Sequence, residues 1–214
     1  VCVAITANVF EFERQGEREG QESWGTGNWE YYPLMPIVAR DKVLLDPTGT
    51  WTESKWILTY QMAMGLFLNA NFPGSTSPEV QWDPHLARIW FNTAVAFQRH
   101  VGSRYLDERM VDYVKVSADV TRSQFETHEV LANWSKTSTY EAGGHTLASE
   151  GFLITSDAGD LAAGIFTGYN GQDLAGGDHY IIVTRYPDSI VVNHPQGDST
   201  RIRLDTGLLN TTEM

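Results

Sequence analysis

The sequence predicts an α/β domain followed by an antiparallel β-sandwich. Up to about residue 120, apolar strand-like runs alternate with long helical patterns, which is typical of parallel βα units. After that point, short alternating runs are separated by Gly, Asn and Asp turns, and no helical pattern returns. The chain also opens on Val1–Ile5, which fits a buried strand with nothing before it to pair with. We therefore interpret residues 1–120 as the closing part of a larger α/β domain, residues 121–206 as a sandwich and residues 207–214 as a tail.

The first strand and the loop after it begin the α/β part. Val1–Val9 is apolar except at Thr6 and Asn8, which predicts a strand buried on both faces. Residues 10–30 are polar, charged and glycine-bearing. Because this stretch is too long for a plain connection, we expect it to be a functional or mobile loop. A second short strand is predicted over Val43–Leu45.

Two helices follow the second strand. Thr50 begins a capping-box pattern, and the apolar spacing predicts a helix that runs from there through Asn69. Asp83-Pro84 combines a good N-cap with a proline at the first helical position. The helix that begins there is expected to end or break at Gly102. One or two further helical turns are predicted over Tyr105–Tyr113.

The second half of the chain predicts short strands joined by tight turns. Asn170-Gly171 is a strong hairpin signal, and Pro187–Ser189 joins two runs that are rich in Ile and Val. The predicted strands are Glu129–Asn133, Gly151–Thr155, Ala162–Phe166, His179–Thr184, Ser189–Asn193 and Arg201–Leu204.

Composition and motif spacing argue against several classes of partner and site. The chain has 15 Lys and Arg against 27 Asp and Glu, a net charge of −12, which disfavours nucleic acid and anionic membranes as partners. Cys2 is the only cysteine, so no internal disulfide and no Cys zinc cluster can form. His128-Glu129 is followed by Ala132 where a zinc-protease motif needs its second histidine. We expect no metal and no cofactor, and the localisation stays open between secretion and the cytoplasm.

Two segments of the second half resemble parts of a known protein family. Val130–Ser135 is an apolar strand that ends in Asn-Trp, and Gly144–Phe152 is a Gly turn followed by a strand with Gly-Phe. Both resemble the first strands of the β-sandwiches that follow TIM barrels in glycoside hydrolases. Upstream, Tyr32–Val38 looks like the approach to a last barrel strand, and the helix carrying Trp56 looks like a closing barrel helix.

This resemblance implies the last βα units of a (β/α)8-type barrel with an appended antiparallel β-sandwich. It implies a carbohydrate-active hydrolase, or a relative of unknown activity, with a carbohydrate as substrate. A whole barrel has eight βα units, of which about two can be counted here. We therefore expect a partner in the remainder of the same polypeptide N-terminal to Val1, and we expect the portion alone to be inactive.

Acidic residues at strand ends are the candidates for catalysis. Glycosidases use two carboxylates across the scissile bond, and barrel enzymes place such groups at the C-terminal ends of strands. Glu11 and Glu13 follow the first predicted strand and Asp46 follows the second. Glu11 is the position we would choose first, as acid, base or nucleophile. The alternatives are a solvated acidic loop for Glu11 and Glu13, and simple turn chemistry for Asp46-Pro47.

Aromatic residues in the same loop are the candidates for substrate binding. Trp24, Trp29 and Tyr31 lie among glycines and an asparagine, which favours partial exposure. Sugar rings have apolar faces that stack on aromatic side chains. The alternative is that these side chains stack on one another or lie in the core.

Three hypotheses for the whole chain remain open at this point. The first is a portion of a glycoside hydrolase that uses Glu11. The second is a carbohydrate-binding or structural β-sandwich module without chemistry, supported by a helical α/β part. The third is a complete small α+β protein in which residues 1–120 cover a sheet by themselves.

Overall fold

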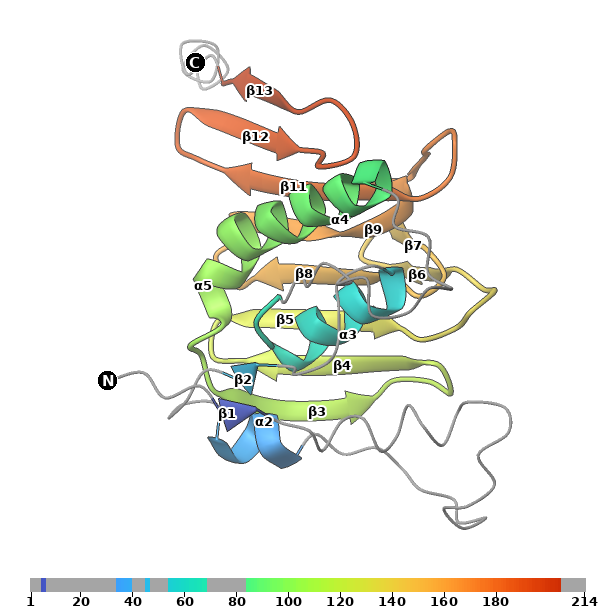
Figure 1. Cartoon of the computed structure of the whole chain (residues 1–214). Coiled ribbons are helices and arrows are strands. Elements are labelled where there is room, and N and C mark those ends of the chain that lie inside the picture. The colour runs from blue at the N-terminus through green and yellow to red at the C-terminus, as the bar shows by residue number, and fades with distance from the viewer. Residues whose placement is uncertain (1–4, 7–33, 40–44, 47–53, 69–83, 205–214) are drawn as a thin grey trace, which may run out of the picture.

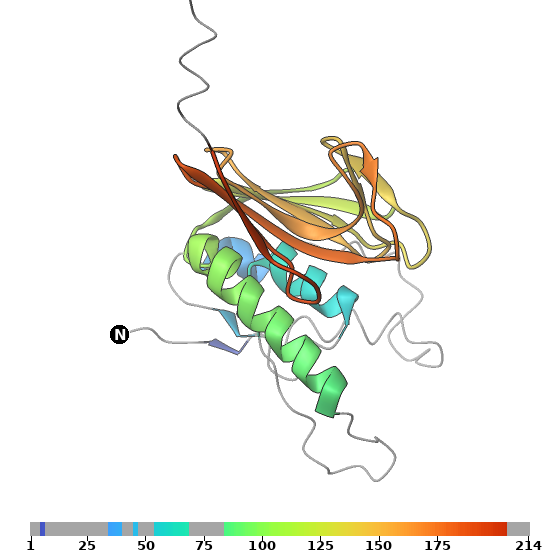
Figure 2. The same cartoon turned by 90° about the horizontal axis from the view of Figure 1, so that it is seen from above.

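The computed structural model describes residues 5–6, 34–39, 45–46, 54–68 and 84–204. Its main body is an 11-stranded sheet with helices on one face (Figures 1 and 2). The strands of this sheet are β3 (Met110–Lys115), β4 (Val120–Phe125), β5 (His128–Asn133), β6 (Tyr140–Ala142), β7 (His145–Leu147), β8 (Phe152–Ser156), β9 (Leu161–Tyr169), β10 (Gln172–Asp173), β11 (His179–Arg185), β12 (Ser189–Asn193) and β13 (Thr200–Arg203). The helices are α2 (Leu34–Ala39), α3 (Lys55–Met64), α4 (Pro84–Phe97), the π-helical η2 (Gln98–Gly102) and α5 (Ser103–Tyr105).

The sheet is antiparallel throughout and follows the order of the chain closely. Its strands run β13-β12-β11-β9-β8-β5-β4-β3, while β7 and β10 pair with β9 and β6 pairs with β7. Short hairpins therefore make most of the connections, as expected for strands separated by Gly and Asn turns. The six strands predicted from residue 129 onward are all present as β5, β8, β9, β11, β12 and β13, with ends that differ by a few residues.

The predicted fold class is wrong. The sequence predicts the last βα units of a (β/α)8-type barrel, whereas the described residues form a β-rich fold whose large sheet is antiparallel. The helical stripes misled the prediction, because α3 and α4 cover a face of this antiparallel sheet (Figure 2). An apolar stripe on a helix shows that one face is covered, but it does not reveal whether the sheet beneath is parallel. The domain boundary at residue 120 stays a prediction.

The predicted helix over Tyr105–Tyr113 is also wrong beyond its first residue. Helix α5 ends at Tyr105 and strand β3 begins at Met110. Met110 is buried, whereas Val111 and Val114 are exposed. Strand β3 is the last strand in the order of the sheet. These apolar residues therefore belong to an edge strand and not to one face of a helix.

Helix α3 is buried over most of its length. Its N-cap is Ser54, whose hydroxyl accepts a hydrogen bond from the backbone N–H of Ile57 at 3.3 Å. The expected start at Thr50 lies outside the described residues. The helix ends at Met64 and is capped by Gly65, whose left-handed φ of 61° is suited to glycine. All residues from Ile57 to Met64 are buried, because the helix packs against the sheet within the main core.

Helix α4 confirms the second predicted helix. It begins at Pro84 and continues into the π-helical turn η2, which ends at Gly102, where an end or a break was expected. Helix α5 then places Tyr105 fully inside the core, where its hydroxyl donates to the carbonyl oxygen of Met62 at 2.6 Å. This bond joins the end of the α4–η2–α5 segment to helix α3.

Apolar side chains are buried on both faces of the sheet, which makes the fold sandwich-like. The helix-covered face contributes residues such as Val130, Ile154, Ile165 and Ile182 to one core with α3 and α4. The opposite face has a smaller core that packs against side chains from β6, β7 and the segment after β10. That core contains Leu147, Leu153, Phe166, Ile181 and Val183, with Leu131, Tyr140, Ala142, Tyr169, Leu174, Ile190 and Val192 packed against it.

The first part of the chain supplies a separate two-stranded sheet. Strand β1 (Ile5–Thr6) pairs in parallel with β2 (Leu45–Asp46). These strands lie within or next to the two strands predicted for this part. Leu45 is buried, and its carbonyl oxygen accepts a hydrogen bond from the N–H of Phe67 at 2.9 Å. The segment after α3 therefore holds β2 against the main core.

Candidate functional site

One of the six predicted site residues has a described place in the fold. Asp46 is the last residue of β2, and its backbone pairs in parallel register with Thr6 of β1. The other predicted catalytic and substrate-binding residues lie outside the described residues: Glu11, Glu13, Trp24, Trp29 and Tyr31.

The parallel register of β1 and β2 fixes the direction in which both strands end. Ile5 pairs with Leu45 and Thr6 pairs with Asp46. Because parallel strands run the same way, both chains leave the pair at the same edge. Asp46 lies at that edge, on a strand anchored through the buried Leu45.

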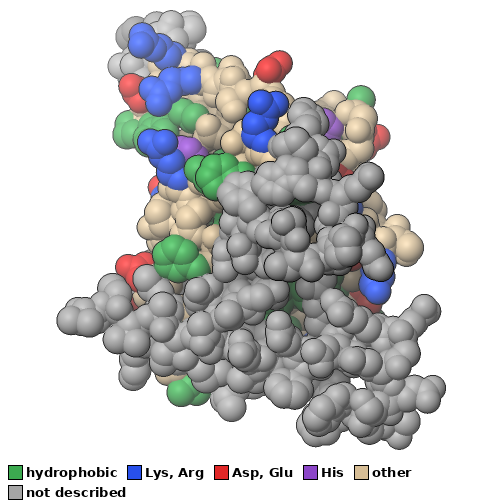
Figure 3. Space-filling view, viewed as in Figure 1, with side chains coloured by type: hydrophobic (Ala, Val, Ile, Leu, Met, Phe, Trp, Pro, Cys, Tyr) green, Lys and Arg blue, Asp and Glu red, His purple; other side chains and the backbone are tan. Residues whose placement is uncertain are grey.

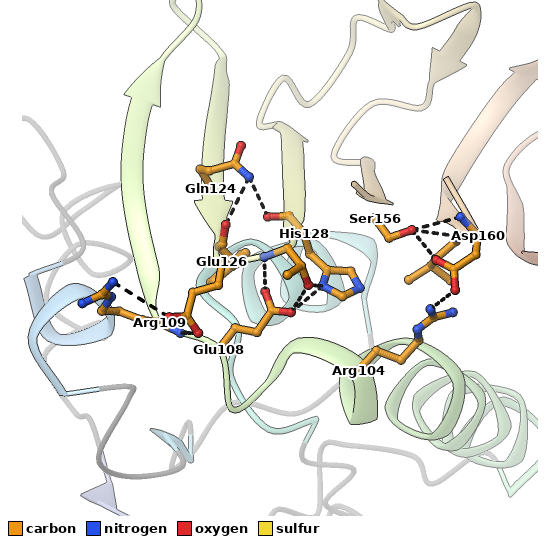
Figure 4. A network of polar contacts seen from close by, with 11 residues as sticks. Arg104, Glu108, Arg109, Gln124, Glu126, His128, Ser156 and Asp160 are labelled. Carbon is orange, nitrogen blue, oxygen red and sulfur yellow. Dashed lines mark hydrogen bonds and ion pairs between the residues drawn. The ribbon is translucent and has the colours of Figure 1, made fainter. Parts of the chain in front are cut away.

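The clearest polar cluster among the described residues lies at one end of the large sheet (Figure 4). Glu108 precedes β3, Thr127 lies in the turn between β4 and β5, and His128 is the first residue of β5. Oε1 of Glu108 lies 2.8 Å from Nδ1 of His128. Glu108 also accepts hydrogen bonds from the backbone N–H of Thr127 at 2.9 Å and from the Thr127 hydroxyl.

The hydrogen bond to Glu108 defines the tautomer of His128. A carboxylate only accepts, so Nδ1 of His128 carries the proton and donates it. The other nitrogen of the ring is Nε2. This nitrogen is buried and has no hydrogen-bond partner among the described residues. The ring packs beside Tyr105, with ring centroids 5.7 Å apart.

The same contacts set the charge of Glu108. Burial acts to raise the pKa of this carboxyl group, but the hydrogen bonds from Thr127 and His128 outweigh it, so that the pKa lies below its ordinary value. The Glu108 side chain is 12% exposed and the His128 side chain is 6% exposed. An ionised carboxylate is therefore held in a nearly closed site by three donors.

A second group lies beside this cluster and involves Ser156 and Asp160 (Figure 4). The hydroxyl of Ser156 donates to Oδ1 of Asp160 at 2.6 Å and accepts from the N–H groups of Asp160 and Leu161. Arg104 forms an ion pair with the other carboxylate oxygen of Asp160. The hydrogen bonds from Ser156 and Arg104 lower the pKa of Asp160. The Ser156 hydroxyl donates its proton to Asp160 and is therefore not placed as a nucleophile. These hydrogen bonds close the turn between β8 and β9.

The outer part of the same network is more exposed. Arg109 lies 3.8 Å from Glu126, and both side chains are about half exposed, at 56% and 50%. Gln124 donates from its amide to the carbonyl oxygens of Phe125 and His128, at 3.1 and 3.2 Å. These bonds brace the β4–β5 turn.

Glu108 and His128 are arranged like the carboxylate–histidine pair of an enzyme, but a substrate cannot reach the histidine. A general base must reach the proton that it removes from a substrate. Nε2 of His128 has almost no surface exposed to solvent, so no substrate can contact it in this state. The cluster therefore stabilises the junction of α5, β3 and β5. Within the described ranges, no group of three or more His, Cys, Asp or Glu side chains is arranged to hold a metal ion.

Sequence reasoning did not find the pairing of Glu108 with His128. The two residues are 20 positions apart and meet only because the β3–β4 and β4–β5 hairpins fold back on each other. No local spacing marks such a contact. The only signal in the sequence is the polar character of Glu108, Thr127 and His128 within otherwise alternating strands.

Basic side chains gather at the opposite end of the sheet. Figure 3 shows Lys and Arg side chains around the end that carries β13 on the helix-bearing face. Arg185, Arg201 and Arg203 are exposed, and the guanidinium of Arg201 lies 6.0 Å from the ring of Tyr186. Strand β13 is the last strand in the order of the sheet, and charged side chains on such an edge strand hinder its pairing with another chain.

No family model and no curated protein matches this chain. In the part of the chain that the structure describes, no helix has both the length and the apolar character needed to cross a membrane.

Proposed function

We propose that this chain takes part in the cleavage of glycosidic bonds, with Asp46 as one of two catalytic carboxylates and the antiparallel sheet as a non-catalytic support. The observation that carries the proposal is the parallel register of Thr6 with Asp46. It supports a common edge, because Thr6 and Asp46, the last residues of β1 and β2, lie side by side there.

The chemistry follows from what glycosidic bonds require. One carboxylic acid protonates the leaving oxygen, and a second carboxylate acts as a base on water or as a nucleophile. Glu11 or Glu13 would supply the partner of Asp46, and the aromatic residues Trp24 and Trp29 would contact the apolar faces of the sugar rings. These are the roles that the resemblance to glycoside hydrolases implies for these residues. The proposed site does not require a closed barrel.

The large sheet supports this proposal because strand β2 packs against its core. Its helix-covered core includes Leu45 of β2 together with residues of α3, β5 and β8. The strand that carries Asp46 is therefore part of the same packed unit as the sheet. A support of this kind holds catalytic groups within the narrow geometry that they need.

The test is a titration of the chain with soluble oligosaccharides of different linkage, followed through tryptophan fluorescence. The sugars that bind are then incubated with the chain, and products are separated by chromatography. We expect saturable binding that Asp46→Asn weakens at least about tenfold, equivalent to about 1.4 kcal/mol. Asp173→Asn, on the exposed strand β10, is the matched control and should bind like the wild type. Absence of binding to any sugar counts against the proposal.

The second candidate is a carbohydrate-binding or structural module without chemistry. It is favoured by the cluster of Glu108 and His128, which brings catalytic residue types together in a closed site that serves packing. This candidate predicts that Asp46→Asn leaves sugar binding unchanged, because the sugar would then contact the sheet and not the β1–β2 edge.

A further inference from the structure

Two histidines face each other on the surface of the sheet opposite the helices. His179 begins β11, and His194 directly follows the end of β12, the neighbouring strand (Figure 1). Nδ1 of His179 lies 3.2 Å from Nε2 of His194. The ring centroids are 5.4 Å apart and the ring planes are nearly perpendicular, at 84°. Both residues are half-buried.

A contact of Nε2 with the backbone fixes which nitrogen of His179 carries the proton. Nε2 of His179 lies 2.9 Å from the carbonyl oxygen of Ala175. Because a carbonyl only accepts, Nε2 carries the proton, and Nδ1 presents its lone pair toward His194. Histidines that bind metals usually donate their other ring N–H to a carbonyl or a carboxylate in this way, and the bond fixes both tautomer and ring orientation.

The ring of His194 is held in place by its own turn. A side-chain carbon added at Gly197 would lie only 2.6 Å from Nδ1 of His194, so the backbone of Gly197 passes directly against the ring.

The carboxylate of Asp178, the residue before His179, is engaged elsewhere. Asp178 precedes His179, and successive residues of a strand point to opposite faces. Its carboxylate forms an ion pair with Lys55 of α3 at 2.7 Å, on the helix-covered side. The Asp178–Lys55 ion pair therefore does not occupy the space between the two rings.

We propose that Nδ1 of His179 and Nε2 of His194 together bind one divalent transition-metal ion of the zinc type, with water in the remaining positions. Zinc binds histidine nitrogen at about 2.0–2.1 Å in a tetrahedral arrangement, which places two ligand nitrogens about 3.3–3.4 Å apart. The observed separation of 3.2 Å fits this geometry. Within the described ranges the site has two protein ligands and not three, so we expect an open site of moderate affinity, with positions left for an exogenous ligand.

The test is calorimetric titration of the full chain, prepared without a histidine tag and stripped of metals, with zinc chloride at pH 7.5. We expect one ion per chain with a Kd in the micromolar range. His179→Ala and His194→Ala should each weaken binding at least about tenfold. His100→Ala removes a histidine from η2 that takes no part in the pair, and it should bind like the wild type.

A spectroscopic measurement on the unmodified chain guards against variants that do not fold. In proton–nitrogen spectra of the histidine rings, zinc should shift Nδ1 of His179 and Nε2 of His194 and leave the ring of His100 unchanged. The alternative for the same geometry is a plain hydrogen bond from His194 to His179 without any metal. Absence of saturable zinc binding, wild-type affinity in both alanine variants, or unshifted resonances of the two rings would each overturn the proposal.

Discussion

Nδ1 of His128 lies 2.8 Å from Oε1 of Glu108, and this contact closes the junction between α5, β3 and β5. Thr127 adds its backbone N–H at 2.9 Å and its hydroxyl to the same carboxylate. Each residue comes from a different element or turn, so the cluster adds polar contacts between segments that also meet in the hydrophobic core. Hydrogen bonds to a buried charge are among the stronger polar contributions to stability.

Glu108→Gln should destabilise the fold at neutral pH. The amide keeps the shape of the side chain but loses the charge, so we expect the free energy of unfolding to fall by about 1–3 kcal/mol at pH 7. Urea denaturation followed by circular dichroism measures the change. Glu126→Gln is the control, because Glu126 is half exposed and its ion pair with Arg109 is long, at 3.8 Å. That control should stay within about 0.5 kcal/mol of the wild type.

The same carboxylate predicts a dependence of stability on pH. The pKa of Glu108 is lowered in the folded state, so its contribution is complete above the ordinary glutamate pKa of about 4.3. The contribution is lost as pH falls through the lower pKa of the folded state. The difference in unfolding free energy between wild type and Glu108→Gln should therefore shrink from pH 7 to about pH 3. A difference that grows on acidification would contradict this assignment.

Tyr105→Phe should destabilise the contact between α5 and α3. The Tyr105 hydroxyl is buried and donates to the carbonyl oxygen of Met62 at 2.6 Å. Its removal leaves that carbonyl without this donor, at a cost of about 1–2 kcal/mol. Tyr186→Phe is the matched control, because Tyr186 is 46% exposed. Equal denaturation midpoints for the two variants would show that the buried bond contributes nothing.

Gly164→Ala should be among the most damaging single substitutions in the sheet. A side-chain carbon at Gly164 would lie 1.9 Å from the carbonyl oxygen of Phe152 and 2.8 Å from the ring of Phe166. The first clash involves the backbone of the paired strand β8, which cannot move without breaking the β8–β9 ladder. We expect a loss of about 3 kcal/mol or more, or failure to fold. Gly102→Ala meets only the flexible ends of Leu106 and Gln98 and should cost far less.

Glu150→Gly should stabilise the fold. Glu150 has a φ of 53°, in the left-handed region that side chains other than Asn and Asp rarely adopt. Its carbonyl oxygen accepts the Thr59 hydroxyl at 2.7 Å, and glycine keeps this bond. Relief of the backbone strain should add up to about 1 kcal/mol, seen as a higher melting temperature. Asn170, with a φ of 50°, is the comparison, since Asn170→Gly should change stability less.

Local patterns predicted the elements of this chain better than their arrangement. Alternation and turn residues located six of the strands from His128 onward, because those signals lie within a few adjacent positions, whereas the short strands β6, β7 and β10 were not predicted. The edge strand β3 was mistaken for helix, since its exposed Val111 and Val114 break the usual alternation of an inner and an outer face. The helices α3 and α4 were located, but their partner sheet was assigned the wrong direction, because the stripe of a helix carries no information on strand direction.

For the candidate sites too, local placement could be predicted from the sequence, whereas contacts between distant residues could not. Asp46 was singled out as the end of a strand, and that placement depends only on the local run Val43–Leu45. The pairs Glu108–His128 and His179–His194 depend on hairpin registers, which place residues far apart in sequence side by side. A histidine or a glutamate within a strand is indistinguishable from its solvated neighbours until those registers are known.

The most direct test of the proposed function is a crystal of the chain soaked with an oligosaccharide that binds in the titration. We expect density for the sugar at the edge of the β1–β2 pair, with a hydroxyl within hydrogen-bond distance of Asp46. Sugar bound only to a face of the large sheet, with none near Asp46, would contradict the proposal of catalysis and leave the chain as a binding module.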